Sequence, residues 1–397
     1  MNVLNITESV LINILRAFVA DNEEKPNIDG VDMRKLFFLA KKNSVVGMVA
    51  YTLDKHKLVE NPDHQEKFNH EYERTVMAML SREASAAVLC KKLYDNKIEH
   101  ILFKGMMVAE TYPVPALRTY GDVDIVIREQ DVNTLCEYMI SQGYKHSVAD
   151  AGVVNVFEKG KEHYEFHKNL NVSNLKDTSY FERLWEHTME HNRYSLRFDH
   201  NFHLCYLITH LEKHVYGSGA GIRMYLDIAL YINKYRDKLD LDEVRKVLTD
   251  VNLGEFLNTV LFVCNKWFSL AVPSWVKPMD DELYNKMCDF MFSGGVFGDM
   301  SSEKNVENAL RQNMQSSKKT ARFKFLMSRI FPPFHELARM YPRYSGKPYL
   351  APVAWVNHLI VFFKNKKYKR VKVVASADTS SAQQKKEFLE SIGSVHR

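Results

Sequence analysis

Two aspartates stand one residue apart where a strand is expected to begin, in the run from Gly121 to Ile127. Alternate strand side chains point to the same face of a sheet, so Asp122 and Asp124 should lie side by side. Neither has a basic neighbour in sequence, and a hard divalent cation would relieve their repulsion. Mg²⁺ is typically held by one or two carboxylates and substrate phosphates. The pair therefore predicts a Mg²⁺ site, with Mn²⁺ as the alternative ion, although a turn residue followed by a surface aspartate would give the same pattern.

A third carboxylate, Glu165, lies on a second strand-like run with an aromatic residue on either side. Its face of that strand also carries His163 and His167. A carboxylate on a neighbouring strand can join a metal pair or accept the proton of an attacking hydroxyl. The other interpretation is a solvated strand face. Zinc is disfavoured, because His and Glu on one strand lack the usual spaced partners.

Lys104-Gly105 closes a short apolar run and opens a segment with helical character. Backbone N–H groups at such a helix start can meet a phosphate, and the Lys104 ammonium is a point charge suited to the same anion. Arg118 stands four residues before Asp122, within reach of a phosphate or of the carboxylates. An ordinary turn between a strand and a helix is the alternative interpretation of Lys104-Gly105.

Four polar residues repeat at helical spacing further along the chain. His210 and His214 are four residues apart, and so are Arg223 and Asp227, which we expect to form an ion pair. The two helices could close over the sheet and contact the base, the sugar or the acceptor. They could equally form a polar seam between packed helices.

The elements that must position these residues follow from periodicity. Residues 1–95 form an N-terminal helical region, 96–175 an α/β core with a hairpin, 176–372 a C-terminal helical domain, and 373–397 a linker and mobile tail. Strand, helix, strand, helix and hairpin in succession indicate a small mixed sheet. The predicted fold class is α+β, with helices on both sides of the core in sequence.

Composition sets limits on the class of protein. The chain has 397 residues with 54 Lys and Arg against 49 Asp and Glu, so the net charge of +5 is too small to indicate nucleic acid by itself. Five scattered cysteines predict reduced thiols without disulfides. We expect no secretory signal and no transmembrane helix, since the N-terminus has no basic region and no apolar run reaches about 18 residues. These features predict a cytoplasmic protein.

Residues 355–372 combine an aromatic and apolar stretch with a cluster of lysines and an arginine. Such a segment can make weak contact with an anionic membrane surface or with nucleic acid. The alternative is a helix that packs on the helical domain and leaves its charged end in solvent.

The order of these motifs resembles a known superfamily. A strand that ends in Lys104-Gly105, a helix, and then Pro113, Arg118, Asp122 and Asp124 at their observed spacing are similar to the DNA polymerase β-type nucleotidyltransferases. The resemblance extends, more weakly, over about residues 10–360, and within the superfamily it is to a bacterial branch often found with polysaccharide-biosynthesis genes. Where the superfamily usually has Gly-Ser or Gly-Gly, this chain has Lys-Gly.

The resemblance implies a reaction and roles. A nucleoside triphosphate would donate its monophosphate to an acceptor hydroxyl, in surface-polysaccharide synthesis if the branch is a guide. Asp122, Asp124 and Glu165 would hold Mg²⁺. The remaining candidates would contact the nucleotide: Lys104, Gly105, Arg118, His210, His214, Arg223 and Asp227. A phosphotransferase on the same fold and a non-catalytic nucleotide-binding protein are the alternatives, and the acceptor is left open.

Overall fold

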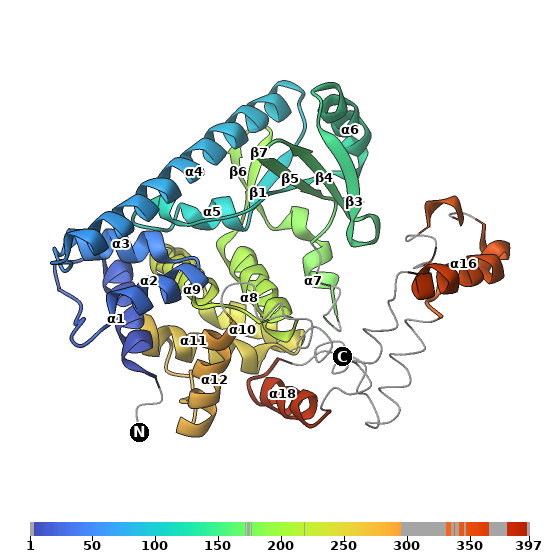
Figure 1. Cartoon of the computed structure of the whole chain (residues 1–397). Coiled ribbons are helices and arrows are strands. Elements are labelled where there is room, and N and C mark those ends of the chain that lie inside the picture. The colour runs from blue at the N-terminus through green and yellow to red at the C-terminus, as the bar shows by residue number, and fades with distance from the viewer. Residues whose placement is uncertain are drawn as a thin grey trace. The chain divides into compact units, whose positions relative to one another are not determined.

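The structure is a computed structural model that describes residues 4–170, 172, 175, 177–217, 219–294, 331–334, 337, 341–344, 347–364 and 379–394. It divides into two compact units, the first made of Met1–Gly298 with Ile392–Arg397 and the second of Asp299–Ser391 (Figure 1). All elements predicted to carry the site lie in the first unit.

A seven-stranded mixed sheet forms the centre of the first unit, in the order β3-β4-β5-β2-β1-β7-β6. The β1–β7 and β2–β5 pairs are parallel and the others are antiparallel. The strands are β1 (His100–Phe103), β2 (Val123–Ile127), β3 (Lys145–Ala149), β4 (Val154–Lys159), β5 (Glu162–His167), β6 (Thr188–Asn192) and β7 (Ser195–Phe198). The α+β class, the mixed sheet and the β4–β5 hairpin are confirmed.

Three strands, β3, β6 and β7, were not expected from the sequence. β3 and β6 are the two edges of the sheet, and most of their side chains are exposed. A strand of this kind needs no run of apolar residues, because its backbone pairs on one side only and its side chains meet water. Periodicity in the sequence therefore gave no signal for these edges.

Helices cover the sheet and make up the regions that precede and follow it in sequence. They are α1 (Ile6–Ala20), α2 (Met33–Lys42), α3 (Val46–Lys55), α4 (Pro62–Asp95), α5 (Gly105–Ala109), α6 (Val132–Ser141), α7 (Ser179–Glu182), α8 (His200–Tyr216), α9 (Ile222–Lys234), α10 (Leu241–Asp250), α11 (Gly254–Phe268) and α12 (Asp281–Gly294). α1 packs against α3 and α11, and Arg16 Nε donates to the Trp267 carbonyl at 3.0 Å. Helices far apart in sequence thus form one layer.

Different helices cover the two faces of the sheet (Figure 1). Val123, Ile125 and Ile127 of β2 pack with residues of α4 and α6 in a continuous apolar core. The opposite face of β2 carries Asp124, and it is covered by α8, since the Tyr206 ring lies 5.4 Å from that of Phe103. The alternation along β2 therefore directs one aspartate away from the core and toward α8.

The last described residues return to the first unit. Ile392 is fully buried, and its carbonyl accepts a hydrogen bond from Thr259 Oγ1 at 3.1 Å. Ser394 Oγ donates to Glu212 Oε1 at 2.8 Å. The end of the predicted tail, 373–397, is therefore anchored on α8 and α11 by buried polar contacts.

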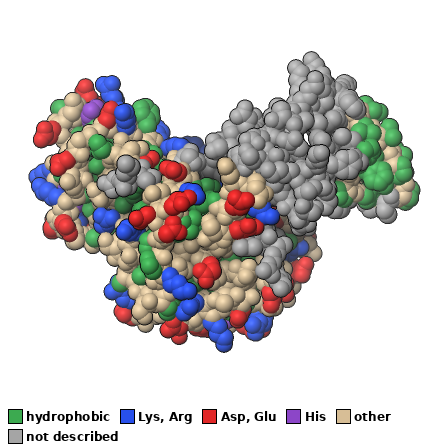
Figure 2. Space-filling model, turned by 90° about the horizontal axis from the view of Figure 1, so that it is seen from below, with side chains coloured by type: hydrophobic (Ala, Val, Ile, Leu, Met, Phe, Trp, Pro, Cys, Tyr) green, Lys and Arg blue, Asp and Glu red, His purple; other side chains and the backbone are tan. Residues whose placement is uncertain are grey.

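The second unit has its own small core. Leu337, Tyr344 and Ala354 are buried, while Val353, Val356 and Ile360 of α16 (Ala351–Lys364) are more than half exposed. Side chains of this helix form the apolar patch at the right of Figure 2. Residues 365–372 lie outside the described residues, so contact of 355–372 with a membrane or nucleic acid stays a prediction. No helix in the described ranges is long and apolar enough to cross a membrane.

Candidate functional site

Asp124 sits at the middle of the sheet, and it is only 4% exposed. Its Oδ1 atom accepts hydrogen bonds from Lys104 Nζ at 2.6 Å and from His167 Nε2 at 2.9 Å. Burial alone would raise the pKa of Asp124, but the Lys104 ammonium and the His167 contact hold that pKa well below its usual range. Asp124 is therefore ionised, and the cation beside it is not a neighbour in sequence but Lys104, 20 residues earlier.

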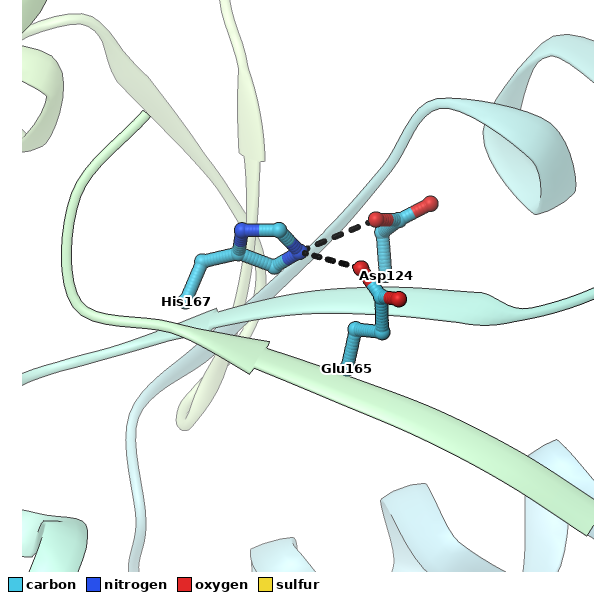
Figure 3. Close-up of side chains that lie close together, drawn as sticks. All are labelled: Asp124, Glu165 and His167. Carbon is cyan, nitrogen blue, oxygen red and sulfur yellow. Dashed lines mark hydrogen bonds and ion pairs between the residues drawn. The ribbon is translucent and has the colours of Figure 1, made fainter. Parts of the chain in front are cut away.

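Glu165 joins Asp124 through strand register. β2 and β5 are parallel with Asp124 opposite Glu165, and Figure 3 shows both side chains turned toward the His167 imidazole. One ligand atom from each of the three residues lies within 4.8 Å of the others. Glu165 Oε2 is 3.6 Å from His167 Nε2, and Glu165 Oε1 is 3.4 Å from His163 Nε2. The expected face of His163, Glu165 and His167 thus points toward Asp124.

Asp122 lies just before β2 and is partly buried. It is not a member of the Asp124–Glu165–His167 group, which is the cluster of potential ligands among the described residues. Burial and Asp124 dominate the pKa of Lys104, burial and Asp227 that of Arg118, and burial and Arg118 that of Arg223. The Asp122 charge adds only a minor stabilisation of these three cations. Asp122 therefore borders the same charged region without sharing the metal-ligand geometry of Asp124.

Lys104 adopts an unusual backbone conformation, with φ 54° and ψ −125°. This region is favoured by glycine, and a residue with a Cβ stores on the order of 1–3 kcal/mol of strain there. The conformation turns the chain sharply from β1 into α5 and brings the Lys104 side chain to Asp124. Burial would lower the pKa of Lys104, but Asp124 holds it above its usual value, so the ammonium is always charged.

Gly105 has a steric reason to be glycine. A Cβ at this position would lie 2.7 Å from Arg118 Nη1 and 2.8 Å from the Tyr120 Cβ. Because both neighbours are tightly held, a side chain at position 105 would displace Arg118. α5 is only five residues long, so the phosphate contact expected at its start would depend more on Lys104 than on a helix dipole.

Arg118 is engaged by Asp227 of α9. Arg118 Nε and Nη2 donate to the two Asp227 oxygens at 3.2 and 2.8 Å, and Tyr112 Oη donates to Asp227 Oδ1 at 2.6 Å. Both members of the ion pair are at most 11% exposed. The expected Arg223–Asp227 ion pair is therefore wrong for the described part of the chain, where Asp227 pairs with an arginine 109 residues earlier.

Arg223 binds the loop that precedes β2. Its Nη1 donates to the Thr119 carbonyl at 2.6 Å and to Thr119 Oγ1 at 2.9 Å. No carboxylate among the described residues lies within ion-pair distance of Arg223, and its Nε is buried there without a hydrogen-bond partner. Burial and the neighbouring Arg118 both lower the pKa of Arg223. Arg223 is thus a poorly compensated cation with unused donors.

α8 contributes aromatic side chains at four-residue intervals. The Tyr206 ring stacks 5.9 Å from that of His210, which meets the His214 ring edge-on at 4.6 Å. Burial, followed by the Lys104 charge, lowers the pKa of His210 well below its usual value. Burial and Lys213 lower the pKa of His214 to about 4. Both imidazoles are therefore neutral at pH 7 and can donate or accept one hydrogen bond each.

Three residues of this region were not singled out from the sequence. Tyr206 could have been found, since it lies one turn before His210 on the same helix face. Tyr112 and Thr119 had no local signal, because they contact α9 residues more than one hundred positions away. His167 was placed on the correct face but without a role.

The comparisons with known proteins gave one match. A sequence model of a family described as uncharacterised nucleotidyltransferase matches residues 29–269. The matched range contains every strand of the sheet and the helices from α2 to α11. No curated protein and no solved structure matches the chain.

Proposed function

This chain belongs to the family of uncharacterised nucleotidyltransferases, and from this premise we propose that it moves a nucleoside monophosphate from a nucleoside triphosphate to an acceptor hydroxyl with the help of Mg²⁺. The observation that carries the proposal is the cluster of Asp124, Glu165 and His167 beside Lys104. Acidic ligands next to cations without full compensation suit a metal and a polyphosphate together.

The donor set fits one divalent cation. Two carboxylates and an imidazole suit Mg²⁺ or Mn²⁺, with Mn²⁺ more tolerant of the nitrogen ligand. Asp124 and Glu165 would hold the ion, and Asp122, which borders this cluster without belonging to it, would add a further oxygen ligand once the ion is bound. A metal at this place supplies positive charge that stabilises the phosphate oxygens during transfer.

Two cations of the chain are assigned to the phosphates. Arg223 has a buried, unused Nε and no carboxylate partner among the described side chains, so an anionic ligand would satisfy it. Lys104 lies beside Asp124, which keeps the pKa of the ammonium above its usual value, so Lys104 is charged at neutral pH. Arg118 is a positioning residue in this proposal, because its donors to Asp227 fix the loop that carries Thr119 and hence Arg223.

Glu165 is the proposed base. About a quarter of its side chain is exposed, so an acceptor hydroxyl can approach it, whereas Asp124 is closed off. Glu165 would take the proton of the attacking hydroxyl as the oxygen bonds to the α-phosphorus and pyrophosphate leaves. The neutral His210 and His214 would hydrogen-bond the base, the sugar or the acceptor, and Gly105 and Asp227 keep Lys104 and Arg118 in place.

A non-catalytic nucleotide-binding protein is the second candidate. The observation that favours it is the Lys104–Asp124 contact at 2.6 Å, since a carboxylate that is neutralised by a lysine does not require a metal. The two functions predict the same binding partner and differ in whether any phosphorus group is transferred.

The test uses the four nucleoside triphosphates, each labelled at the α- or the γ-phosphate, with Mg²⁺ and extract of the source cell. Nucleotidyl transfer puts the α-label in a new product, whereas phosphotransfer puts the γ-label there. Asp122→Asn should abolish the product, while Asp237→Asn, an exposed change on another surface, should retain it. Binding of a triphosphate without any labelled product would favour the non-catalytic alternative. A surface polysaccharide as the labelled product would support the role in surface-polysaccharide synthesis that the resemblance implies.

A further inference from the structure

Lys104 neutralises Asp124, the most buried carboxylate of the candidate metal site. Its Nζ lies 2.6 Å from Asp124 Oδ1, and the same oxygen also accepts from His167. The lysine side chain is 17% exposed and the aspartate 4%. A cation at this distance in a largely buried place neutralises the carboxylate and repels a second cation. In this state Asp124 is a poor metal ligand.

The contact can be exchanged, because Asp124 is the one carboxylate bound to Lys104 among the described residues, and the contact of the ammonium with the Phe103 ring, at 5.0 Å from the centroid, is weak. Lys104 has one carboxylate partner and a four-carbon stem, and its ammonium can turn toward another acceptor without loss of the charge. Arg118, by contrast, is held on both oxygens of Asp227. Of these two paired cations, Lys104 is therefore the one whose ion pair can be exchanged.

A phosphate has a place to go next to Lys104. Gly105, the residue after Lys104, approaches Arg118 so closely that a Cβ would lie 2.7 Å from Arg118 Nη1. Arg118 Nη1 and Arg223 Nη1 both donate to the Thr119 carbonyl, so Lys104 and Arg223 border the same region. Arg223 offers a buried Nε without a partner in the described structure. An anion drawn to Arg223 would compete with Asp124 for the Lys104 ammonium.

We propose that Lys104 couples metal binding to phosphate binding: its ammonium holds Asp124 until a substrate phosphate takes the ammonium over, and only then is Asp124 released to bind a divalent cation. This inference rests on the proposed function, since it assigns the metal to Asp124 and the phosphate to Arg223. It implies that the metal alone binds weakly, and that phosphate and metal each strengthen the binding of the other by the same factor.

The test measures Mn²⁺ binding to the full chain by electron paramagnetic resonance, with no nucleotide present. Lys104→Met keeps the length of the stem and removes the charge, and it should tighten Mn²⁺ binding by about tenfold or more. Lys104→Gly is a second variant, which also removes the strained φ of 54° and guards against a folding defect. Lys213→Met, a neighbouring partly buried lysine without a carboxylate contact in the described ranges, is the control and should change the affinity much less.

Inorganic phosphate provides the second arm, with the free Mn²⁺ concentration corrected for its phosphate complex. Phosphate should tighten Mn²⁺ binding to the wild type and leave Lys104→Met unchanged. Tight binding of Mn²⁺ by the wild type alone, or an equal effect of phosphate on both proteins, would overturn the coupling while the transferase proposal stands. If no variant binds Mn²⁺ in either arm, both the coupling and the metal-dependent function are wrong.

Discussion

Two buried ion pairs lie in the first unit, with N···O distances of 2.6 and 2.8 Å, and their carboxylates are hydrogen-bonded to different extents. The first joins Lys104 to Asp124 on the sheet, and the second joins Arg118 to Asp227 at the seam with α9. Both involve a carboxylate that is less than 10% exposed. They differ in how completely the carboxylate is satisfied.

At the seam, Asp227 accepts from Arg118 on both oxygens and from Tyr112 on one. On the sheet, both donors to Asp124 use Oδ1, and no hydrogen bond from the described residues reaches Oδ2. A carboxylate with both oxygens hydrogen-bonded, such as Asp227, contributes to the stability of the fold. A carboxylate with one oxygen left without a partner and with acidic neighbours, such as Asp124, can exchange its partners. The comparison therefore assigns chemistry to the sheet and stability to the seam, and four measurements test that division.

Glu165→Gln gives the largest expected effect on the sheet side. Glutamine keeps the shape of glutamate but cannot accept the proton, so turnover should fall by about 10²–10⁴-fold with little change in triphosphate affinity. Turnover is measured on the labelled product, and affinity by calorimetry. Glu190→Gln on the exposed edge strand β6 is the matched control. An unchanged rate for Glu165→Gln would transfer the role of the base to another group.

Asp227→Asn gives the largest expected effect on the seam. Arg118 would be left buried without its counter-ion, a loss that typically costs about 3–5 kcal/mol of unfolding free energy. Urea unfolding measures the effect, with the exposed Asp237→Asn as control. If stability were retained and only nucleotide binding were lost, Asp227 would belong to the site rather than to the seam.

A double-mutant cycle sharpens the difference at Asp124. Asp124→Asn and Lys104→Met should each destabilise the fold, because each leaves one buried charge uncompensated. The double variant should be more stable than the sum of the two changes by about 1–3 kcal/mol. Additive effects would show that the two groups are not coupled.

The pH dependence of stability is the smallest expected effect, and it concerns the region around Lys104. His214, near Lys104, has a folded pKa of about 4, below its unfolded value. As pH falls from about 6.5 to 4 the unfolded chain takes up a proton that the folded chain does not, so stability is lost by up to about 1.4 kcal/mol per pH unit. His214→Gln should reduce the slope of the thermal unfolding temperature against pH over this interval, while His210, whose pKa is also lowered, keeps part of it. An unchanged slope would mean that His214 titrates normally in the folded protein.

The sequence predicted the central strands and the α+β class because these strands are short, mainly apolar runs bounded by turn residues. β2 reads Val-Asp-Ile-Val-Ile, and all five of its residues are buried. The edges β3 and β6 could not be predicted, since exposed strands leave no such pattern. The candidate site residues could be predicted from residue type and spacing. Their arrangement around Asp124 and Arg118 could be seen only in the structure.

By itself the sequence determined which side chains share a face. Alternation along β2 puts Asp124 on the face opposite the apolar core. His210 and His214 lie one helical turn apart and therefore share a face of their helix. These are local rules that need no partner. Partner choice was decided only by the tertiary structure. Asp227 pairs with Arg118 instead of Arg223, and Lys104 neutralises Asp124 from the end of the neighbouring strand β1. Such contacts depend on strand order and helix packing, which bring together residues that are 20 to 109 positions apart, and spacing along the chain carries no information about them.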